Sequence, residues 1–264
     1  MNNKHSIYSS VLTIQKCAFT LAETLIVIGI IGVVAALTLP NLNSSTDDKE
    51  KVVKLVKIYT NLNDAFGRAV AVYGSIDTWH ISDSSEISVY SSRFGSRLAD
   101  FLKISKNCGI KANENCFYSS GAKFSNGTAS GIKKDSDTNY YKFILSDGVS
   151  VGFERYLECY NDFIDDEAVC GWVYIDISGP NKGKHMCGYD VFDFYITENG
   201  FVPIGIEKDV YGDTKDKLLG NCFKTGIHCG GWVIKNLNMD YLKAKNGACN
   251  SGSVNLSWSN TTCK

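Results

Sequence analysis

An apolar stretch near the start of the chain constrains this protein more than any other feature. Residues 19–39 contain a single ionisable side chain, that of Glu23. About 20 apolar residues in a helix span ~30 Å of hydrocarbon. A secretory signal peptide has a shorter apolar region with a small-residue cleavage site after it, and no such site follows Pro40. We therefore expect residues 19–40 to form a transmembrane helix.

The charges around the stretch predict its orientation. Lys4 and Lys16 precede it, and a polar segment follows Pro40. Because basic residues favour the cytoplasmic side of a bilayer, residues 1–18 are expected in the cytoplasm and the rest of the chain outside.

Glu23 has two interpretations. As an acid in the first turn of a helix, it would be stabilised by ~0.3–1 kcal/mol at the positive end of the helix dipole. The helix-dipole interpretation explains poorly why the acid follows Phe19 and Leu21, because a charge inside a membrane normally needs a partner. If the chain were cut just before Phe19, the new α-amine would lie about one helical turn from Glu23. The amine and the carboxylate could then neutralise each other, within one chain or between neighbours.

Residues 18–40 resemble a known protein signal. Ala18, then "FTLAE", then "TLIVIGIIGVVAALTLP" are similar to the processing and methylation signal of type IV pilins and type II secretion pseudopilins. The resemblance implies that a prepilin peptidase cleaves between Ala18 and Phe19, that Phe19 is N-methylated, and that Glu23 pairs with the terminal amine of a neighbouring subunit during filament assembly. The family usually has Gly where this chain has Ala18.

The rest of the chain predicts an α+β fold. Apolar residues recur with helical spacing from Val52 to Tyr73, so residues 19–74 are expected to form one long N-terminal helix with its membrane-spanning first half. A second helix is expected near 90–104. After residue 140, β-rich runs flank Asp147-Gly148 and Asn199-Gly200, which are hairpin signals. Residues 75–264 are thus expected to form an extracytoplasmic, disulfide-rich, pilin-like head whose antiparallel sheet packs on the helix.

The cysteines indicate an oxidising compartment. The chain has ten, and all but Cys17 follow the apolar stretch. Sequence alone does not fix connectivity. Local pairing is the simplest arrangement and leaves Cys187 unpaired; its pairs are Cys108–Cys116, Cys159–Cys170, Cys222–Cys229 and Cys249–Cys263. The sequence contains no Cys-x-x-Cys motif, so it gives no indication of a structural zinc site.

Catalytic motifs are absent from the sequence, so we expect no enzyme and no cofactor. None of the four histidines lies in His-Glu-x-x-His, and there is no Gly-x-Ser-x-Gly. Four residues offer oxygen ligands around one loop, as a calcium site would: Asp176, Ser178, Asn181 and Asp190. Turns are rich in the same residue types for backbone reasons, so this remains one of two interpretations.

The expected function is structural: a pilin-like or pseudopilin subunit of a type II secretion or type IV pilus filament. Its expected partners are the prepilin peptidase, other subunits, the assembly platform and the bacterial inner (plasma) membrane, before incorporation into a periplasmic or surface filament. The alternative is a minor pilin whose head binds DNA, a secreted substrate or a surface. The net charge of −1 gives no overall basic footprint for nucleic acid. Basic residues in one amphipathic stretch, Arg93, Arg97, Lys103 and Lys106, show no clear aromatic face.

Overall fold

The computed structural model describes residues 21–79, 84–164, 167–206, 214–252 and 254–263, apart from the side chains of 23–24, 32–45, 161–164 and 167. The chain divides into two compact units, Met1–Thr46 and Asp47–Lys264. Helix α1 (Leu21–Tyr73) contributes to both, so the boundary lies within a helix.

The expectation that the first half of this helix spans a membrane is corrected by the structure. Within the described ranges, no helix combines the length and the apolarity needed to cross a lipid bilayer. The expected fold class is wrong on this point, and so is the single-pass inner-membrane location derived from it.

In the second unit, residues 47–73 of α1 form one side of the main core. The apolar stripe expected from the sequence is buried at Leu55, Ile58, Leu62, Phe66 and Ala69. The charged side chains of Lys57, Asp64 and Arg68 are exposed on the other side of the helix. This division is the period of an amphipathic helix that covers a sheet.

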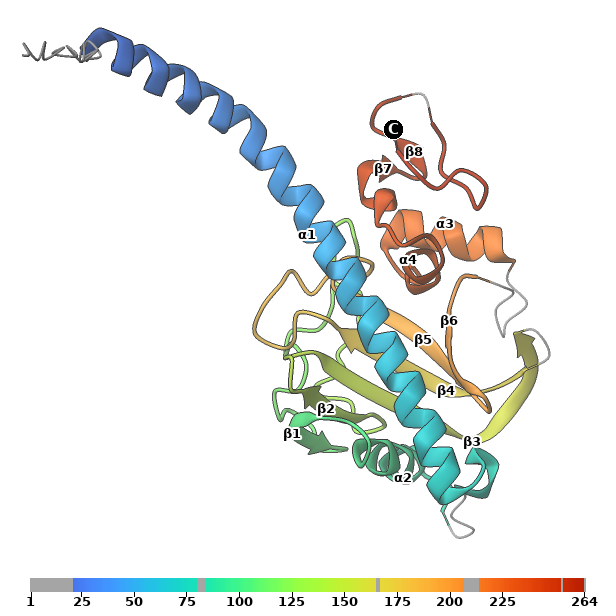
Figure 1. Cartoon of the computed structure of the whole chain (residues 1–264). Coiled ribbons are helices and arrows are strands. Elements are labelled where there is room, and N and C mark those ends of the chain that lie inside the picture. The colour runs from blue at the N-terminus through green and yellow to red at the C-terminus, as the bar shows by residue number, and fades with distance from the viewer. Residues whose placement is uncertain (1–20, 80–83, 165–166, 207–213, 253, 264) are drawn as a thin grey trace, which may run out of the picture. The chain divides into compact units, whose positions relative to one another are not determined.

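The sheet opposite this helix is a six-stranded antiparallel meander (Figure 1). Each strand pairs with the next along the chain. The strands are β1 (Ile104–Gly109), β2 (Tyr141–Leu145), β3 (Ser150–Ile164), β4 (Glu167–Asp176), β5 (Val191–Thr197) and β6 (Gly200–Pro203). In Figure 1 the second part of α1 runs across one face of the sheet.

Turn chemistry fixes the hairpins where the sequence predicts them. Asp147 and Gly148 join β2 to β3, and Gly148 has a φ of +84°, which glycine adopts without a steric penalty. The amide of Gly148 donates to the carbonyl of Leu145 at 2.9 Å. Asn199 lies in the turn between β5 and β6.

Two side chains of α1 cover the edge of the sheet at β6. Asn63 Oδ1 accepts a hydrogen bond from the amide of Phe201 at 2.9 Å, and Tyr59 Oη donates to the carbonyl of the same residue at 3.0 Å. An uncovered edge strand would offer these backbone groups to another chain. The helix therefore both buries its stripe and protects this edge.

An aromatic cluster closes the end of the core next to helix α2 (Ile87–Ala99) and the short 3₁₀ helix η1 (Ile76–Trp79). The ring of Phe94 lies 5.3 Å from that of Phe153 and 5.8 Å from that of Trp79. Such edge-on and tilted contacts add to the burial of apolar area.

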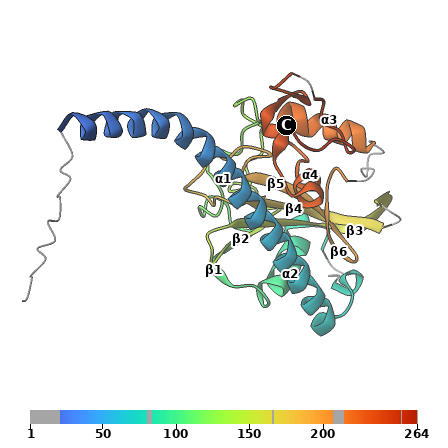
Figure 2. The same cartoon turned by 45° about the horizontal axis from the view of Figure 1, so that its top comes forward.

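The C-terminal part adds short helices beside β5 and β6. Helix α3 spans Lys215–Thr225. Thr214 caps its N-terminus, where the Thr214 side chain accepts a hydrogen bond from the amide of Lys217, and Gly226 caps its C-terminus. Helix α4 (Gly230–Asn236) lies against β5 and β6 (Figure 2). The turn η2 (Asp240–Lys243) and the two-stranded β7 (Ala244–Lys245) and β8 (Ala248–Cys249) follow.

We predict that Gly95→Ala destabilises the protein although alanine is the better helix former. A Cβ at Gly95 would lie 2.2 Å from the Tyr141 ring and 2.7 Å from its Cβ, so α2 would have to move off β2. The expected loss is about 1–3 kcal/mol of unfolding free energy.

Gly67→Ala is the matched control for that variant. Gly67 lies on the exposed face of α1, and a Cβ there would meet nothing within 4 Å. It should be neutral or stabilise the protein by up to about 1 kcal/mol. Denaturant unfolding of both variants is the measurement, and equal effects would contradict the close approach of α2 to Tyr141.

Candidate functional site

The residues expected to act in filament assembly are largely outside the described part of the chain. Ala18 and Phe19, the expected cleavage and methylation positions, are not among the described residues. Glu23 lies in α1, but its side chain is not described. The structure therefore leaves the proposed pairing of Glu23 as a prediction.

The first unit does show an apolar helix surface beyond Glu23. Six large apolar side chains are each more than half exposed within this unit: Leu25, Ile26, Val27, Ile28, Ile30 and Ile31. Residues 25–28 are consecutive, and consecutive residues of a helix point in directions about 100° apart. The apolar surface thus surrounds the helix, whereas an amphipathic helix shows a single stripe. A surface of this kind marks a site of association.

The disulfides connect the pairs that local pairing predicts. Cys108 bonds to Cys116, Cys159 to Cys170, Cys222 to Cys229, and Cys249 to Cys263. Among the cysteines that the structure describes, Cys187 forms no disulfide, and it is buried. Burial raises the pKa of its thiol to about 12, so this thiol stays protonated and unreactive at neutral pH.

The residues proposed as calcium ligands already form hydrogen bonds within the protein. Asp190 accepts from the amides of Lys184, His185 and Met186. Asp176 accepts from the amide of Ser178 at 2.9 Å, and its other oxygen lies 2.8 Å from His185 Nδ1. Asn181 Oδ1 accepts from the Asn115 side chain at 3.5 Å. The arrangement is a loop closed by its own donors, as the turn interpretation expects.

Asp176 and His185 form a buried pair on the face of the sheet that points away from α1. Val173 and Ile175 of β4 belong to the core under α1, so Tyr174 and Asp176, which alternate with them, face the other side. Burial raises the pKa of Asp176 to about 6, although the hydrogen bond with His185 opposes this shift. The His185 ring stacks on Tyr118 with centroids 4.0 Å apart.

The cavity next to this pair is too small for an organic ligand. Its volume is about 20 Å³, and Tyr118, Lys134, Tyr174 and His185 are among its lining residues. That space accommodates a water molecule and little more. The Lys134 ammonium occupies part of this region and lies 3.7 Å from the centre of the Tyr140 ring. We therefore assign a structural role to the pair.

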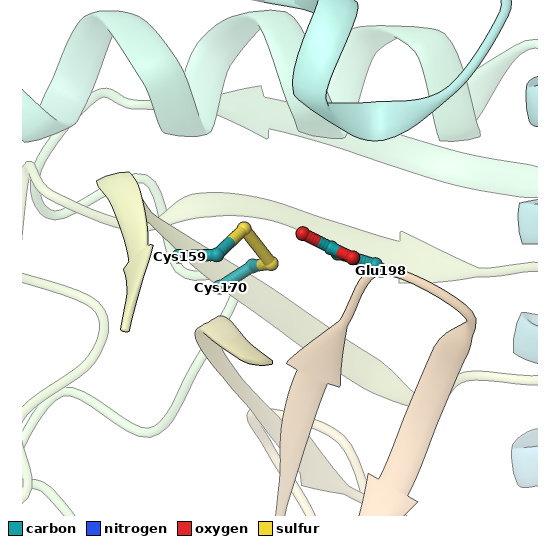
Figure 3. Close-up of side chains that lie close together, drawn as sticks. All are labelled: Cys159, Cys170 and Glu198. Carbon is teal, nitrogen blue, oxygen red and sulfur yellow. A yellow bond between two sulfur atoms is a disulfide. The ribbon is translucent and has the colours of Figure 1, made fainter. Parts of the chain in front are cut away.

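A second cluster of chemical interest lies where β3, β4 and the β5–β6 turn meet (Figure 3). In the described part of the chain, Cys159, Cys170 and Glu198 are the side chains that come close enough to share a metal ion, with ligand atoms within 4.8 Å of one another. The two sulfurs are bonded to each other, so they offer no thiolate to a metal. Glu198 is exposed, and Cys159 is half-buried.

Arg155 completes this cluster from β3. Its Nη2 donates to Cys159 Sγ at 3.3 Å, and its Nη1 donates to the carbonyls of Tyr156 at 2.6 Å and Cys170 at 3.0 Å. Burial lowers the pKa of Arg155 to about 10, so the guanidinium remains charged at neutral pH. The amide of Arg155 bonds to Ser91 Oγ at 2.9 Å, next to the register shift in β3. Sequence analysis missed Arg155 and Glu198 because only the sheet register brings them to the disulfide.

One basic residue of α2, Arg97, has aromatic neighbours in the structure. The Arg97 guanidinium lies 5.1 Å from the Tyr73 ring centre and 5.0 Å from that of Trp79. Trp79 is buried and donates through Nε1 to the carbonyl of Gly74. These rings therefore hold the Arg97 guanidinium in place.

Comparison with known proteins found no matching family model, no matching curated protein and no matching solved structure. Function must be argued from this chain's own residues.

We predict that Asp176→Asn changes how stability depends on pH. Because the carboxyl has a folded pKa near 6, above its ordinary value of 3.8, the folded state holds a proton between these pH values that the unfolded state has lost. This group's contribution to stability is full below about pH 3.8 and declines by about 1.4 kcal/mol per pH unit as pH rises towards 6. Unfolding of both proteins from pH 3.5 to 7 measures it. A difference between them that does not vary with pH would contradict the raised pKa.

Proposed function

We propose that this chain is a pilin-like or pseudopilin subunit of a type II secretion or type IV pilus filament. A prepilin peptidase would process it between Ala18 and Phe19, and its N-terminal helix would assemble it with other subunits. The observation that supports this most directly is the apolar surface around residues 25–31, which begins two residues after Glu23.

Helical packing between subunits would account for that surface. An apolar surface on all sides of one helix cannot be covered by one flat partner, whereas a bundle of like helices covers it from several directions. Gly29 leaves room for a neighbour, since a Cβ there would meet nothing within 4 Å. The energetic gain is the removal of apolar area from water.

Glu23 is suited to control this packing. In a bundle of apolar helices its carboxylate would be removed from water, and an unpaired charge there costs several kcal/mol. The α-amine of a processed Phe19 on a neighbouring subunit would neutralise it. The pair would then favour the helix register that brings the two groups together.

The second unit fits a domain exposed to an oxidising medium outside the cytosol. Four disulfides close short loops in it, with sequence separations of 7 to 14 residues. Such bonds persist where thiols are not kept reduced.

Processing provides the first test. In cells with an active prepilin peptidase, the mature chain should begin at Phe19 and carry an N-methyl group. Mass spectrometry of the N-terminal peptide measures this. A chain that retains Met1 in those cells would refute the proposal.

Assembly provides the second test. Glu23→Ala should leave cleavage intact, because the cut lies outside the altered side chain, but should reduce the fraction of processed protein in sheared filaments by about tenfold or more, as expected when one partner of a desolvated pair is removed. Glu50→Ala is the matched control, because Glu50 is an exposed acid on the same helix. Equal incorporation of both variants would make Glu23 a first-turn acid worth less than about 1 kcal/mol.

A further inference from the structure

Helix α2 carries two arginines that line one open hollow on the surface of the second unit. Arg93 and Arg97 lie one helical turn apart, a spacing that makes their side chains neighbours. The other residues that line this hollow are Val89, Ser92, Ser96 and Ile110. Its volume of about 490 Å³ lies within the range of sites for small organic molecules. The α2 hollow, as we call it, therefore combines space for a ligand with two positive charges.

The guanidinium of Arg97 is fixed and poorly hydrated. Its central carbon lies 5.1 Å from the ring centre of Tyr73 and 5.0 Å from that of Trp79. Nη1 of Arg97 is buried, and it has no hydrogen-bond partner in the described part of the chain. Desolvation by burial lowers the pKa of Arg97, and the adjacent charge of Arg93 lowers it further. Such a cation gains more from a bound anion than a fully hydrated surface arginine does.

The described residues supply no carboxylate that pairs with Arg97. None of the ion pairs in the described ranges involves this side chain. Asp100, which follows α2 directly, accepts a hydrogen bond from Tyr73 Oη at 2.6 Å. The positive charge of Arg97 is therefore left for a ligand to balance.

We propose that the α2 hollow binds the phosphate group of a small phosphate monoester. A monoester phosphate carries about 1.5–2 negative charges at neutral pH, which matches the charge of two guanidiniums. A phosphate diester, as in a nucleic-acid backbone, carries one negative charge and balances one of them. Guanidinium groups also present paired N–H donors to phosphate oxygens. The organic part of the ester would lie in the rest of the hollow, where Val89 and Ile110 contribute apolar surface.

The first experiment tests the charge match in the full-length, oxidised chain. Glycerol 3-phosphate and dimethyl phosphate are titrated separately at neutral pH and constant ionic strength, and calorimetry measures each dissociation constant. The monoester is expected to bind at least about fivefold more tightly than the diester, because it brings a second negative charge to two fixed cations. Equal affinities, or no binding of the monoester, would overturn the proposal.

The second experiment tests the two arginines. Arg93→Gln removes one charge and leaves the contacts of Arg97 with Tyr73 and Trp79 in place, and it should weaken binding of glycerol 3-phosphate about tenfold. Arg68→Gln is the matched control, because Arg68 is an exposed arginine on α1 that already pairs with Asp64 at 3.8 Å. Its affinity should equal that of the unaltered chain. Equal affinities of both variants would refute the assignment.

A third measurement needs no substitution. Phenylglyoxal modifies accessible arginines, and mass spectrometry of the digested chain gives the rate at each position. Glycerol 3-phosphate should slow the modification of Arg93 and Arg97 and leave that of Arg68 unchanged. Equal protection of all three arginines, or protection of none, would show that the ligand does not occupy the α2 hollow.

Discussion

The second unit depends on the burial of the apolar stripe of α1 residues 47–73 against one face of the antiparallel sheet. Leu55, Ile58 and Leu62 are almost fully buried there. The same helix satisfies both backbone groups of Phe201 at the sheet edge through Asn63 and Tyr59. This amphipathic helix thus supplies the apolar area that drives its packing on the sheet. It also supplies the polar groups that cover the sheet edge at β6.

The opposite face of the sheet is held by polar contacts. Asp135 accepts from the amides of Cys116 and Phe117, and the buried Lys142 ammonium donates to the carbonyls of Asp135 and Asp137. Each buried charge therefore has partners, which burial requires. This face carries the Asp176–His185 pair. Farther along β3 and β4 the strand register shifts, and Arg155 is brought to the Cys159–Cys170 bond.

Short sequence patterns predicted many elements of the second unit. They did not predict the contacts between segments that are far apart in the chain. The Asp147-Gly148 turn and the four short-range disulfides follow from neighbouring residues, because turn conformation and short loop closure are local properties. Helix α3 was missed although Thr214 and Gly226 are its boundary residues, since seven polar or glycine positions obscure its apolar pattern. The membrane-spanning half of the first helix was expected and was wrong for the described residues.

The sequence by itself determined the amphipathic stripe of α1, the hairpin turns and the presence of disulfide-forming cysteines, because spacing and residue type are sufficient for each. It also provides the resemblance to a prepilin processing signal on which the proposed function rests. Only the tertiary structure decided that Arg155 contacts Cys159 Sγ with Glu198 nearby, and that Asp190 accepts from the backbone amides of its own loop. The reason is physical: strand register and loop closure set the distances between residues far apart in the chain, and the electrostatics of a site depends on those distances.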